Sequence, residues 1–495
     1  MNHGYPLGWL VASIVLVVSW VPSRSSGQSG FELEPYRIRA LVAFAPIPEL
    51  NAHRIDFVHS ELMVRTTSRL GAPWELEIEP ASADLRSKLL GRIEIITLAD
   101  VMAAVEDFSD LDKVILIGVS GSSTGYRVTA RELDRVSSLW GVSIERMMSQ
   151  PDHLIETIYH AIVNAFSPIS QIGRPEGKKV DVRLRAGALA IDEKSPVLAD
   201  QGTVLLPILR RNDRLGKAYQ SGLKPVPWTY LLAGKREGSV LYCEIHSGMR
   251  NPLGGRSVGR RTLRLALVIR PEPKSSELRL RARIPRQTKV SKKQVAGQPG
   301  KMLAGYDIYA RTPARLTAEK PDKTEKTEYV GRTDYRGVVM IPPGKQVLRI
   351  LYVKNGGELL ARLPMVPGLN DFEIAEVPDD DKRLEAEGYI TGLQEKLVDL
   401  VVRRKLLAAR VRQRIQSGKF DDAENLLGQF KMIERPAEFS YELQQKQQEL
   451  ASEDSRIQSK ITILFEHTQT LLNQFLSDDE EAKLSSELED ARRSS

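Results

Sequence analysis

The first part of the chain, residues 31–175, combines two hydrophobic patterns. Continuous or alternating apolar runs predict strands at 36–44, 75–79, 113–119 and 126–132. Apolar residues at helical spacing predict helices at 54–70, 81–90, 98–108 and around Leu154, Ile158, Ala161, Ile162 and Ala165. Because a polar, Gly-rich stretch at 120–125 separates the last two strands, we expect them to pair as a hairpin. The segment therefore predicts a small α/β domain.

The next segment, residues 176–272, contains short apolar runs separated by Gly and Pro. Strands are expected at 180–189, 204–210, 228–235, 240–247 and 262–269. Their regular spacing favours a small antiparallel β domain, either a barrel or a sandwich.

Residues 273–378 continue the strand pattern, with strands expected at 277–284, 304–309, 347–353 and 359–363. Residues 330–342 read Val-Gly-Arg-Thr-Asp-Tyr-Arg-Gly-Val-Val-Met-Ile-Pro. This stretch resembles the core hairpin of carboxypeptidase regulatory-like, transthyretin-type domains, in which Thr-Asp-x-x-Gly forms the turn. We expect Asp334 to cap the turn and Gly337 to adopt a φ that side chains resist. The resemblance implies a β-sandwich of about seven strands and a non-catalytic module.

Residues 379–495 have the pattern of helices. One face of the first helix contains Ile390, Leu393, Leu397, Leu400, Leu407, Val411 and Ile415, interrupted by Arg404. We expect this helix to stop at Gly418, a capping box at 421–424 to begin a short helix, and a third helix to run from Pro436 to about Leu476. The pattern predicts an antiparallel helical hairpin with a helical insert, whose apolar stripe is covered by its own partner helix or by another chain.

These patterns define a multidomain α+β protein. The expected parts are a signal peptide at 1–27, an α/β domain at 31–175, a small antiparallel β domain at 176–272, a transthyretin-like β-sandwich at 273–378 and a helical tail at 379–495. The element order of the α/β domain resembles that of small domains in periplasmic and outer-membrane accessory proteins, such as those of curli secretion and the flagellar T-ring. This resemblance implies an exported bacterial protein.

The N-terminus predicts where the protein works. Residues 7–21 are an almost unbroken apolar run, and Pro22 and the small residues Ser25, Ser26 and Gly27 follow it. This layout is typical of a secretory signal peptide cleaved after Gly27, because a run of about 15 residues is short for a membrane span. We expect an exported protein in the periplasm or outside the cell. The alternative is an envelope protein anchored by an uncleaved N-terminal segment.

Charge and cysteine content narrow the possible partners. The net charge is +7, but residues 251–320 hold 17 Lys and Arg against 4 Asp and Glu, whereas residues 381–495 are mildly acidic. A basic middle suggests an anionic polymer or an acidic protein as partner, and export disfavours nucleic acid. Cys243 is the single cysteine, so no internal disulfide can form, and its alternation with Leu241 and Ile245 predicts a buried strand thiol.

Gly121-Ser122-Ser123-Thr124-Gly125 fits the G-x-S-x-G motif, which in α/β-hydrolases presents a nucleophile between a strand and a helix. Ser123 would be that nucleophile, with His153, His160, His246 or His467 as the base. Here a strand pattern follows the motif, which favours a hairpin loop instead. Cys243-x-x-His246 is half of a zinc ligand set, and no nucleotide-binding motif occurs, so neither a metal nor a cofactor is expected.

The sharpest binding signal is a basic stripe. Arg279, Arg281 and Arg283 alternate with apolar residues, so that one sheet face would carry three guanidinium groups. The candidate anion- or partner-binding residues are these three with Arg286, Lys289, Lys292 and Lys293, and with Arg256, Arg260 and Arg261 of a Gly-rich loop. The alternative is an ordinary solvated strand face followed by a basic loop.

Our leading hypothesis is a non-enzymatic exported envelope protein that binds or scaffolds a protein or an anionic polymer. A serine hydrolase that uses Ser123 is one alternative. The other is a structural protein that self-assembles through residues 381–495.

Overall fold

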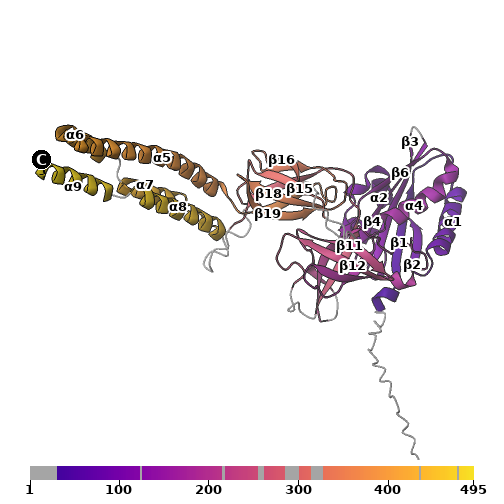
Figure 1. Cartoon of the computed structure of the whole chain (residues 1–495). Coiled ribbons are helices and arrows are strands. Elements are labelled where there is room, and N and C mark those ends of the chain that lie inside the picture. Colours follow the sequence, from indigo (N-terminus) through magenta and orange to yellow (C-terminus); the bar gives the residue numbers. More distant parts are fainter. Residues whose placement is uncertain are drawn as a thin grey trace, which may run out of the picture.

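The computed structural model describes residues 30–494 except 123–124, 215–217, 255–260, 285–299, 314–326, 434–435 and 477–478. It is a mixed α and β structure with several sheets and C-terminal helices, which confirms the expected multidomain α+β class (Figure 1). The expected signal peptide lies outside the described residues. Within them, no helix is both long and apolar enough to cross a membrane.

The N-terminal region is a six-stranded sheet covered by helices on both faces. β1 (Tyr36–Phe44) pairs in parallel with β2 (Trp74–Pro80) and β3 (Lys113–Ser122). The antiparallel strands are β4 (Gly125–Asp134), β5 (Leu139–Trp140) and β6 (Ile144–Met148). β1, β2, β3 and β4 confirm predicted strands, whereas β5 and β6 were not predicted.

Alternating residues of β1 pack into two separate hydrophobic cores, one on each face of the sheet. Ala40 and Val42 pack with α1 (Ala52–Leu70) and α4 (Leu154–Ala165), whereas Leu41 and Ala43 pack with α2 (Ala83–Gly91) and α3 (Leu98–Ala104). Short 3-10 turns lie at η1 (Gly30–Leu33), η2 (Ile93–Ile95), η3 (Phe108–Asp110), η4 (Pro151–His153) and η5 (Gly187–Leu189).

The second region is a closed six-stranded barrel, which decides between the two architectures that the sequence allowed. Its strands are β7 (Ile169–Ile172), β8 (Lys179–Leu184), β9 (Val204–Asn212), β11 (Thr229–Glu237), β12 (Val240–Ser247) and β13 (Thr262–Ile269). The ring closes because β9 pairs with β11 along one edge and with β13 along the other. β10 (Ala218–Pro225) pairs with the C-terminal half of β9. Cys243 is a free, buried thiol in the barrel core, as predicted.

The third region is a sandwich of seven strands in two sheets. One sheet has the order β17-β14-β20, formed by Val338–Ile341, Ser276–Ala282 and Phe372–Val377. The other has the order β16-β15-β18-β19, formed by Glu328–Arg332, Asp307–Arg311, Arg349–Asn355 and Glu358–Met365. Leu278 and Leu280 from the first sheet and Ile308, Leu351 and Val353 from the second share one core.

The Thr-Asp-x-x-Gly turn forms as predicted, but the strands around it are not a hairpin. Asp334 Oδ1 accepts hydrogen bonds from the backbone N–H groups of Arg336 and Val338 at 2.9 and 2.8 Å, and Gly337 has a φ of 70°. β16 pairs with β15, whereas β17 pairs with β14 in the opposite sheet. The reason is the buried Thr333, whose hydroxyl bonds the backbone of Leu303 and Tyr306 and holds the chain where it crosses between layers.

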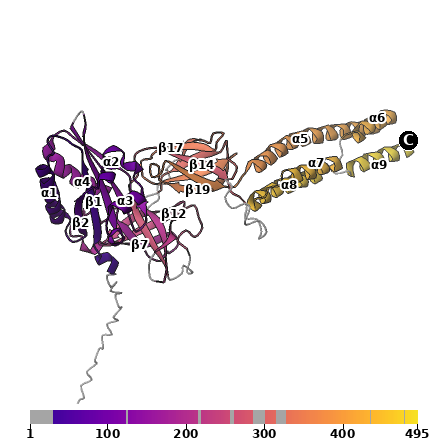
Figure 2. The same cartoon turned by 180° about the vertical axis from the view of Figure 1, so that it is seen from behind.

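The C-terminal helices form a rod that projects from the sandwich, away from the α/β domain (Figures 1 and 2). Its helices are α5 (Asp381–Gln416), α6 (Phe420–Lys431), α7 (Pro436–Glu449), α8 (Ser455–Phe475) and α9 (Asp479–Arg493). One half of α5 packs with α7 and α8, and its other half packs with α6 and α9. The rod therefore consists of two consecutive three-helix bundles instead of the predicted hairpin.

Two details of the helix prediction are wrong and one is confirmed. The predicted third helix breaks into α7 and α8, because the Asp454 side chain accepts the backbone N–H of Arg456 and starts a new helix. The predicted capping box is absent at α6, because the N-cap residue Lys419, which precedes the helix, makes no side-chain cap. α5 ends before Gly418, which adopts the left-handed φ of 68°.

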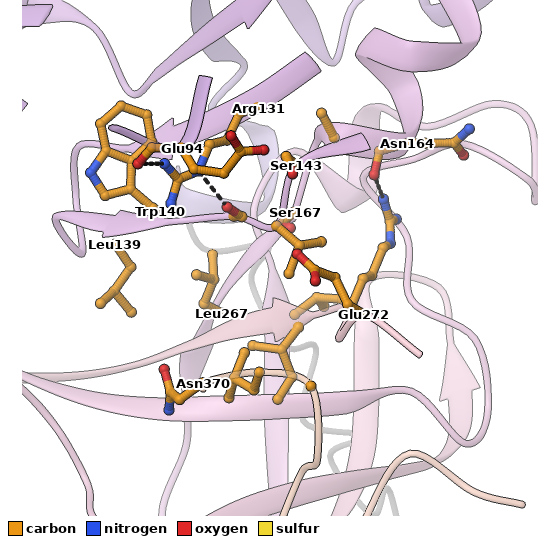
Figure 3. Close-up of a pocket in the computed structure, with 18 of the residues that line it drawn as sticks. Glu94, Arg131, Leu139, Trp140, Ser143, Asn164, Ser167, Leu267, Glu272 and Asn370 are labelled. Atoms are coloured by element: carbon orange, nitrogen blue, oxygen red, sulfur yellow. Dashed lines mark hydrogen bonds between the residues drawn. The ribbon is translucent and has the colours of Figure 1, made fainter. Parts of the chain in front are cut away.

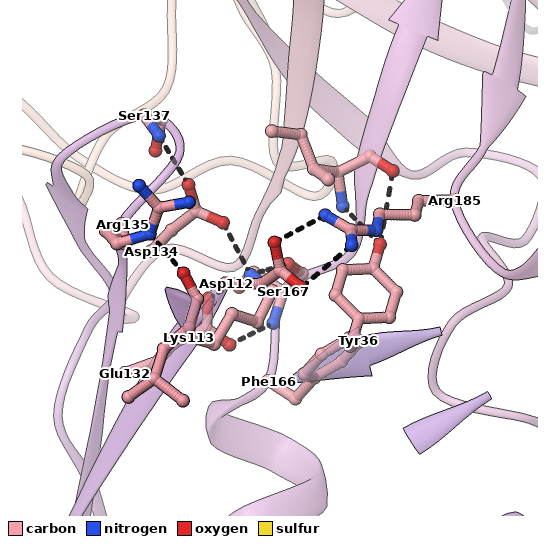
Figure 4. A network of polar contacts seen from close by, with 12 residues as sticks. Tyr36, Asp112, Lys113, Glu132, Asp134, Arg135, Ser137, Phe166, Ser167 and Arg185 are labelled. Carbon is pink, nitrogen blue, oxygen red and sulfur yellow. Dashed lines mark hydrogen bonds and ion pairs between the residues drawn. The ribbon is translucent and has the colours of Figure 1, made fainter. Parts of the chain in front are cut away.

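A buried ionic cluster lies where the α/β sheet meets the barrel (Figure 4). Lys113, fully buried at the start of β3, donates hydrogen bonds to Glu132 and Asp134 of β4 at 2.7 and 2.8 Å and to the carbonyl of Ser167. Beside it, Arg185 from the barrel region binds both oxygens of Asp112, at 2.6 and 2.8 Å.

Aromatic rings complete the cluster. The Lys113 ammonium group lies 5.0 Å from the ring centre of Phe166, and the Arg185 guanidinium lies 5.1 Å from that of Tyr36. The hydroxyl of Tyr36 both donates to the carbonyl and accepts from the N–H of Ile169, the first residue of the barrel. The cluster thus ties the ends of three sheet strands to the barrel.

Replacing Lys113 by Met should leave two buried carboxylates without their cation. We expect the α/β domain to lose about 3–5 kcal/mol of unfolding free energy, measured by denaturant titration of the full chain. The control is Lys88→Met, since Lys88 and its partner Asp100 are partly exposed and such a pair contributes about 1 kcal/mol or less. Equal losses in the two variants would contradict a special role for Lys113.

The cluster should also make stability depend on pH. Burial raises the pKa of Glu132 to about 7, so the folded state takes up a proton that the unfolded chain releases near pH 4.5. Its stabilising contribution is complete below pH 4.5 and is lost as the pH rises through 7. The unfolding free energy of the natural chain, compared with that of Glu132→Gln, should therefore fall by roughly 2–3 kcal/mol between pH 5 and pH 8. If the natural chain keeps or increases its unfolding free energy relative to Glu132→Gln across this range, the raised pKa of Glu132 is refuted.

Candidate functional site

The basic stripe lies on β14, the central strand of the three-stranded sheet. Arg279 and Arg281 point away from the core that Leu278 and Leu280 enter, as predicted. Arg283 lies past the end of the strand and donates to the carbonyl of Glu376. The structure therefore places two of the three arginines on the face.

Of the other predicted basic residues, one lies within the described part of the chain. Arg286, Lys289, Lys292 and Lys293, and Arg256 and Arg260, lie outside the described residues. Arg261 is exposed directly before β13, and its carbonyl accepts the backbone N–H of Asn212 on the barrel.

Carboxylates of the same sheet offset the positive charge of the stripe. Arg279 binds Glu277 through Nε and Nη2, at 3.0 and 2.6 Å, and its guanidinium stacks 4.1 Å from the ring centre of Phe372. Arg281 lies opposite Glu376 in the register between β14 and β20. The face is thus less cationic than the sequence alone implied.

Large apolar side chains surround these arginines on the outer face. Met340, Phe372 and Ile374 are 51%, 48% and 41% exposed. Met340 and Phe372 lie opposite Glu277 on the two neighbouring strands, and Ile374 lies opposite Arg279. We call Glu277, Arg279, Arg281, Met340, Phe372 and Ile374 the arginine face.

Sequence reasoning missed the apolar part of the arginine face. Residues 372–377 were not predicted as a strand, because Phe-Glu-Ile-Ala-Glu-Val carries two glutamates and is followed by an acidic run. The alternation of Phe372, Ile374 and Glu376 was nevertheless a usable signal. One of its glutamates, Glu373, faces inward, and burial raises its pKa beside the hydroxyl of Tyr230.

A cleft of about 470 Å³ lies where the α/β domain, the barrel and the sandwich meet (Figure 3). Arg131 donates to the carbonyls of Gly141 and Glu94, both at 3.0 Å, and stacks on Trp140 with 4.6 Å to the ring centre. Arg270 caps the end of α4 by donating to the carbonyls of Asn164 and Phe166.

The remaining charges of the cleft are also internally paired. Lys274 lies 3.0 Å from Glu272 and 2.9 Å from Asp371. No histidine or cysteine is among the described residues that line the cleft. Arg270 joins the end of the barrel to the α/β domain, whereas Arg131 binds carbonyls of its own domain. The charged groups of the cleft are therefore engaged in internal contacts, and among them Arg270 links the barrel to the α/β domain.

The G-x-S-x-G motif occupies the tip of a β-hairpin. Ser123 and Thr124 lie outside the described residues, but Ser122 ends β3 and pairs with Gly125, the first residue of β4. A hydrolase elbow needs a helix after the nucleophile, and here a strand follows. Two of the candidate bases lie in other regions, since His246 is on barrel strand β12 and His467 is on α8.

Cys243 and His246, the half of a zinc ligand set, are both buried side chains of β12. Burial raises the pKa of Cys243 to about 12 and lowers the pKa of His246 to about 4. Among the described residues, no group of three or more His, Cys, Asp or Glu side chains is arranged to hold a metal ion.

Comparison with known proteins gives no family assignment. The chain matches no protein-family model and no curated protein sequence. Among solved structures it is similar to TolB from Acinetobacter baumannii, with 12% identity over 70% of this chain and 96% of that chain and a TM-score of 0.17. A TM-score of this size does not establish a common fold.

Proposed function

We propose that this chain is an exported, non-enzymatic binding protein of the cell envelope, and that it takes a protein partner on the arginine face. The single observation that supports this most is the exposure of Met340, Phe372 and Ile374 around Arg279 on one sheet face. Apolar side chains interspersed with arginine are typical of protein interfaces, in which aromatic residues, Met and Arg are enriched.

The transthyretin-type resemblance of residues 273–378 supports a binding role. Seven strands in two sheets surround the Thr-Asp-x-x-Gly turn, with Asp334 and Gly337 in the expected conformations. We infer that this region is a module of that type and that it contributes binding or spacing without chemistry.

The attachment of the rod supports a scaffolding role. Arg383 at the base of α5 is buried, binds Asp380 at 2.8 Å and donates to the carbonyl of Asn355 at 2.9 Å. The hydroxyl of Tyr306, in the sandwich, accepts the backbone N–H of Asp380 at 3.0 Å. These contacts fix the direction in which the rod leaves the sandwich, so the rod can hold the binding region at a set distance.

The test is capture of envelope proteins by the tagged full-length chain with and without Phe372→Glu. The new carboxylate can pair with Arg279 and keep the sheet folded, but it removes the central apolar contact. We expect the specifically captured partner to fall at least tenfold, as measured by quantitative mass spectrometry, which is the size of effect typical of a central aromatic contact.

The matched control is Ile191→Glu, because Ile191 is fully exposed and belongs to the barrel region. This variant should capture the same partner as the natural chain. If Phe372→Glu and Ile191→Glu capture the same proteins in equal amounts, the arginine face is not the binding site.

A further inference from the structure

The opposite outer face of the sandwich carries a row of aromatic rings that runs across its strands. Tyr309 of β15 lies directly opposite Tyr329 of β16 on one side and Tyr352 of β18 on the other, and Tyr352 lies opposite Arg362 of β19. The residues that flank them in sequence, such as Ile308, Leu351 and Val353, fill the core. Because side chains alternate along a strand, the three tyrosines and the arginine share the outward face. We call these four residues the tyrosine row.

Positive charge accompanies the rings. The Lys354 ammonium group lies 4.8 Å from the ring centre of Tyr309, and the Arg362 guanidinium lies 5.8 Å from that of Tyr352. Asp307 on the same strand as Tyr309 binds Arg332 at 2.7 and 3.0 Å. Among the described residues, Lys354 and Arg362 lie over rings and form no ion pair, so the tyrosine row together with Lys354 carries net positive charge, unlike the arginine face.

The row is open at one end and bounded at the other. Tyr329 is 54% exposed, whereas Tyr309 and Tyr352 are half-buried, and Tyr352 packs against the apolar cluster between the sandwich and the barrel. Ile350, the outward residue that precedes Tyr352, is buried against Tyr230 and Leu232 of the barrel. The row therefore lies next to the barrel, and its exposed end is at the edge strand β16.

We propose that the tyrosine row binds an anionic polysaccharide laid across the strands. Neighbouring strands are about 4.8 Å apart, so a chain of linked sugar rings that crosses them from the edge meets the exposed ring of Tyr329 and then that of Tyr309 on the next strand. A tyrosine offers an apolar ring face for the C–H groups of a sugar and a hydroxyl for its polar edge. Lys354 and Arg362 supply the charge that a carboxylate or sulfate group of the polymer needs.

The choice of a glycan over single-stranded nucleic acid rests on the exported location in the proposed function. Both polymers combine stacking surfaces with negative charge, and aromatic and basic residues together can bind either. An envelope protein meets polysaccharides, so the row is assigned to them.

The experiment measures binding of the full-length chain to polygalacturonate by isothermal titration calorimetry, with neutral dextran as the uncharged comparison. Polygalacturonate should bind and dextran should not, and raising the salt concentration should weaken binding. Tyr329→Ala should weaken binding about tenfold, because one stacking contact is lost, while Tyr329→Phe should retain it. Arg362→Gln should weaken binding and reduce its salt dependence.

Tyr335→Ala is the matched control, since Tyr335 is 81% exposed but belongs to the turn between β16 and β17. It should bind polygalacturonate like the natural chain. Unchanged circular dichroism of each variant shows that the sandwich is folded.

Three results would overturn the proposal: no binding of polygalacturonate, equal losses for Tyr329→Ala and Tyr335→Ala, or tighter binding of oligo-dT than of polygalacturonate at the tyrosine row. The Phe372→Glu variant separates this proposal from the preceding one. It should bind polygalacturonate normally, so failure of protein capture and failure of glycan binding can be told apart.

Discussion

The arrangement of this protein depends on a single buried ammonium group at the base of the α/β sheet. Lys113 has no access to solvent, so its charge is tolerable only because two carboxylates and a carbonyl surround it. Those groups come from the end of β4 and from the segment that enters the barrel. The ion cluster therefore forms only when the α/β sheet and the barrel are in their native positions, which makes it a condition for their relative placement.

Arginine side chains make comparable polar contacts at other junctions of the chain. Arg131 and Arg270 bind backbone carbonyls at the junction of the three globular regions, and Arg383 binds Asp380 and Asn355 where the rod begins. Each guanidinium satisfies carbonyl groups that would otherwise end a helix or loop without a partner. Arg270 and Arg383 thus join successive regions, and apolar clusters also cross the junctions of the α/β domain with the barrel and of the barrel with the sandwich. The result is an extended molecule in which one end of the tyrosine row packs against the barrel.

The sandwich presents two outer faces of different chemistry. The arginine face combines exposed apolar groups with charges that largely cancel, which suits a protein surface. The tyrosine row combines rings with cations that contact those rings, which suits a charged polymer.

α5 begins four residues after β20 ends, so the rod leaves from the end of the sandwich. With 36 residues, α5 extends for about 54 Å.

Local pattern in the sequence determined most of the individual elements. The α/β hairpin at 113–134, the long helix from 381, its stop at Gly418 and the turn at Asp334 and Gly337 all depend on neighbouring residues, whose spacing is visible in the chain. The same applies to the inward and outward alternation of Leu278, Arg279, Leu280 and Arg281. Such features follow from backbone geometry, which acts over a few residues.

Tertiary structure decided the rest, because pairing between distant segments sets it. The sequence could not tell a barrel from a sandwich at 176–272, since closure depends on the pairing of β9 with β13. It could not show that β16 and β17 join different sheets, that the third predicted helix turns back at Asp454, or that Glu277 and Phe372 neutralise and cover Arg279. The tyrosine row is the clearest case: Tyr309, Tyr329 and Tyr352 are about twenty residues apart in sequence, and only the strand register makes them neighbours.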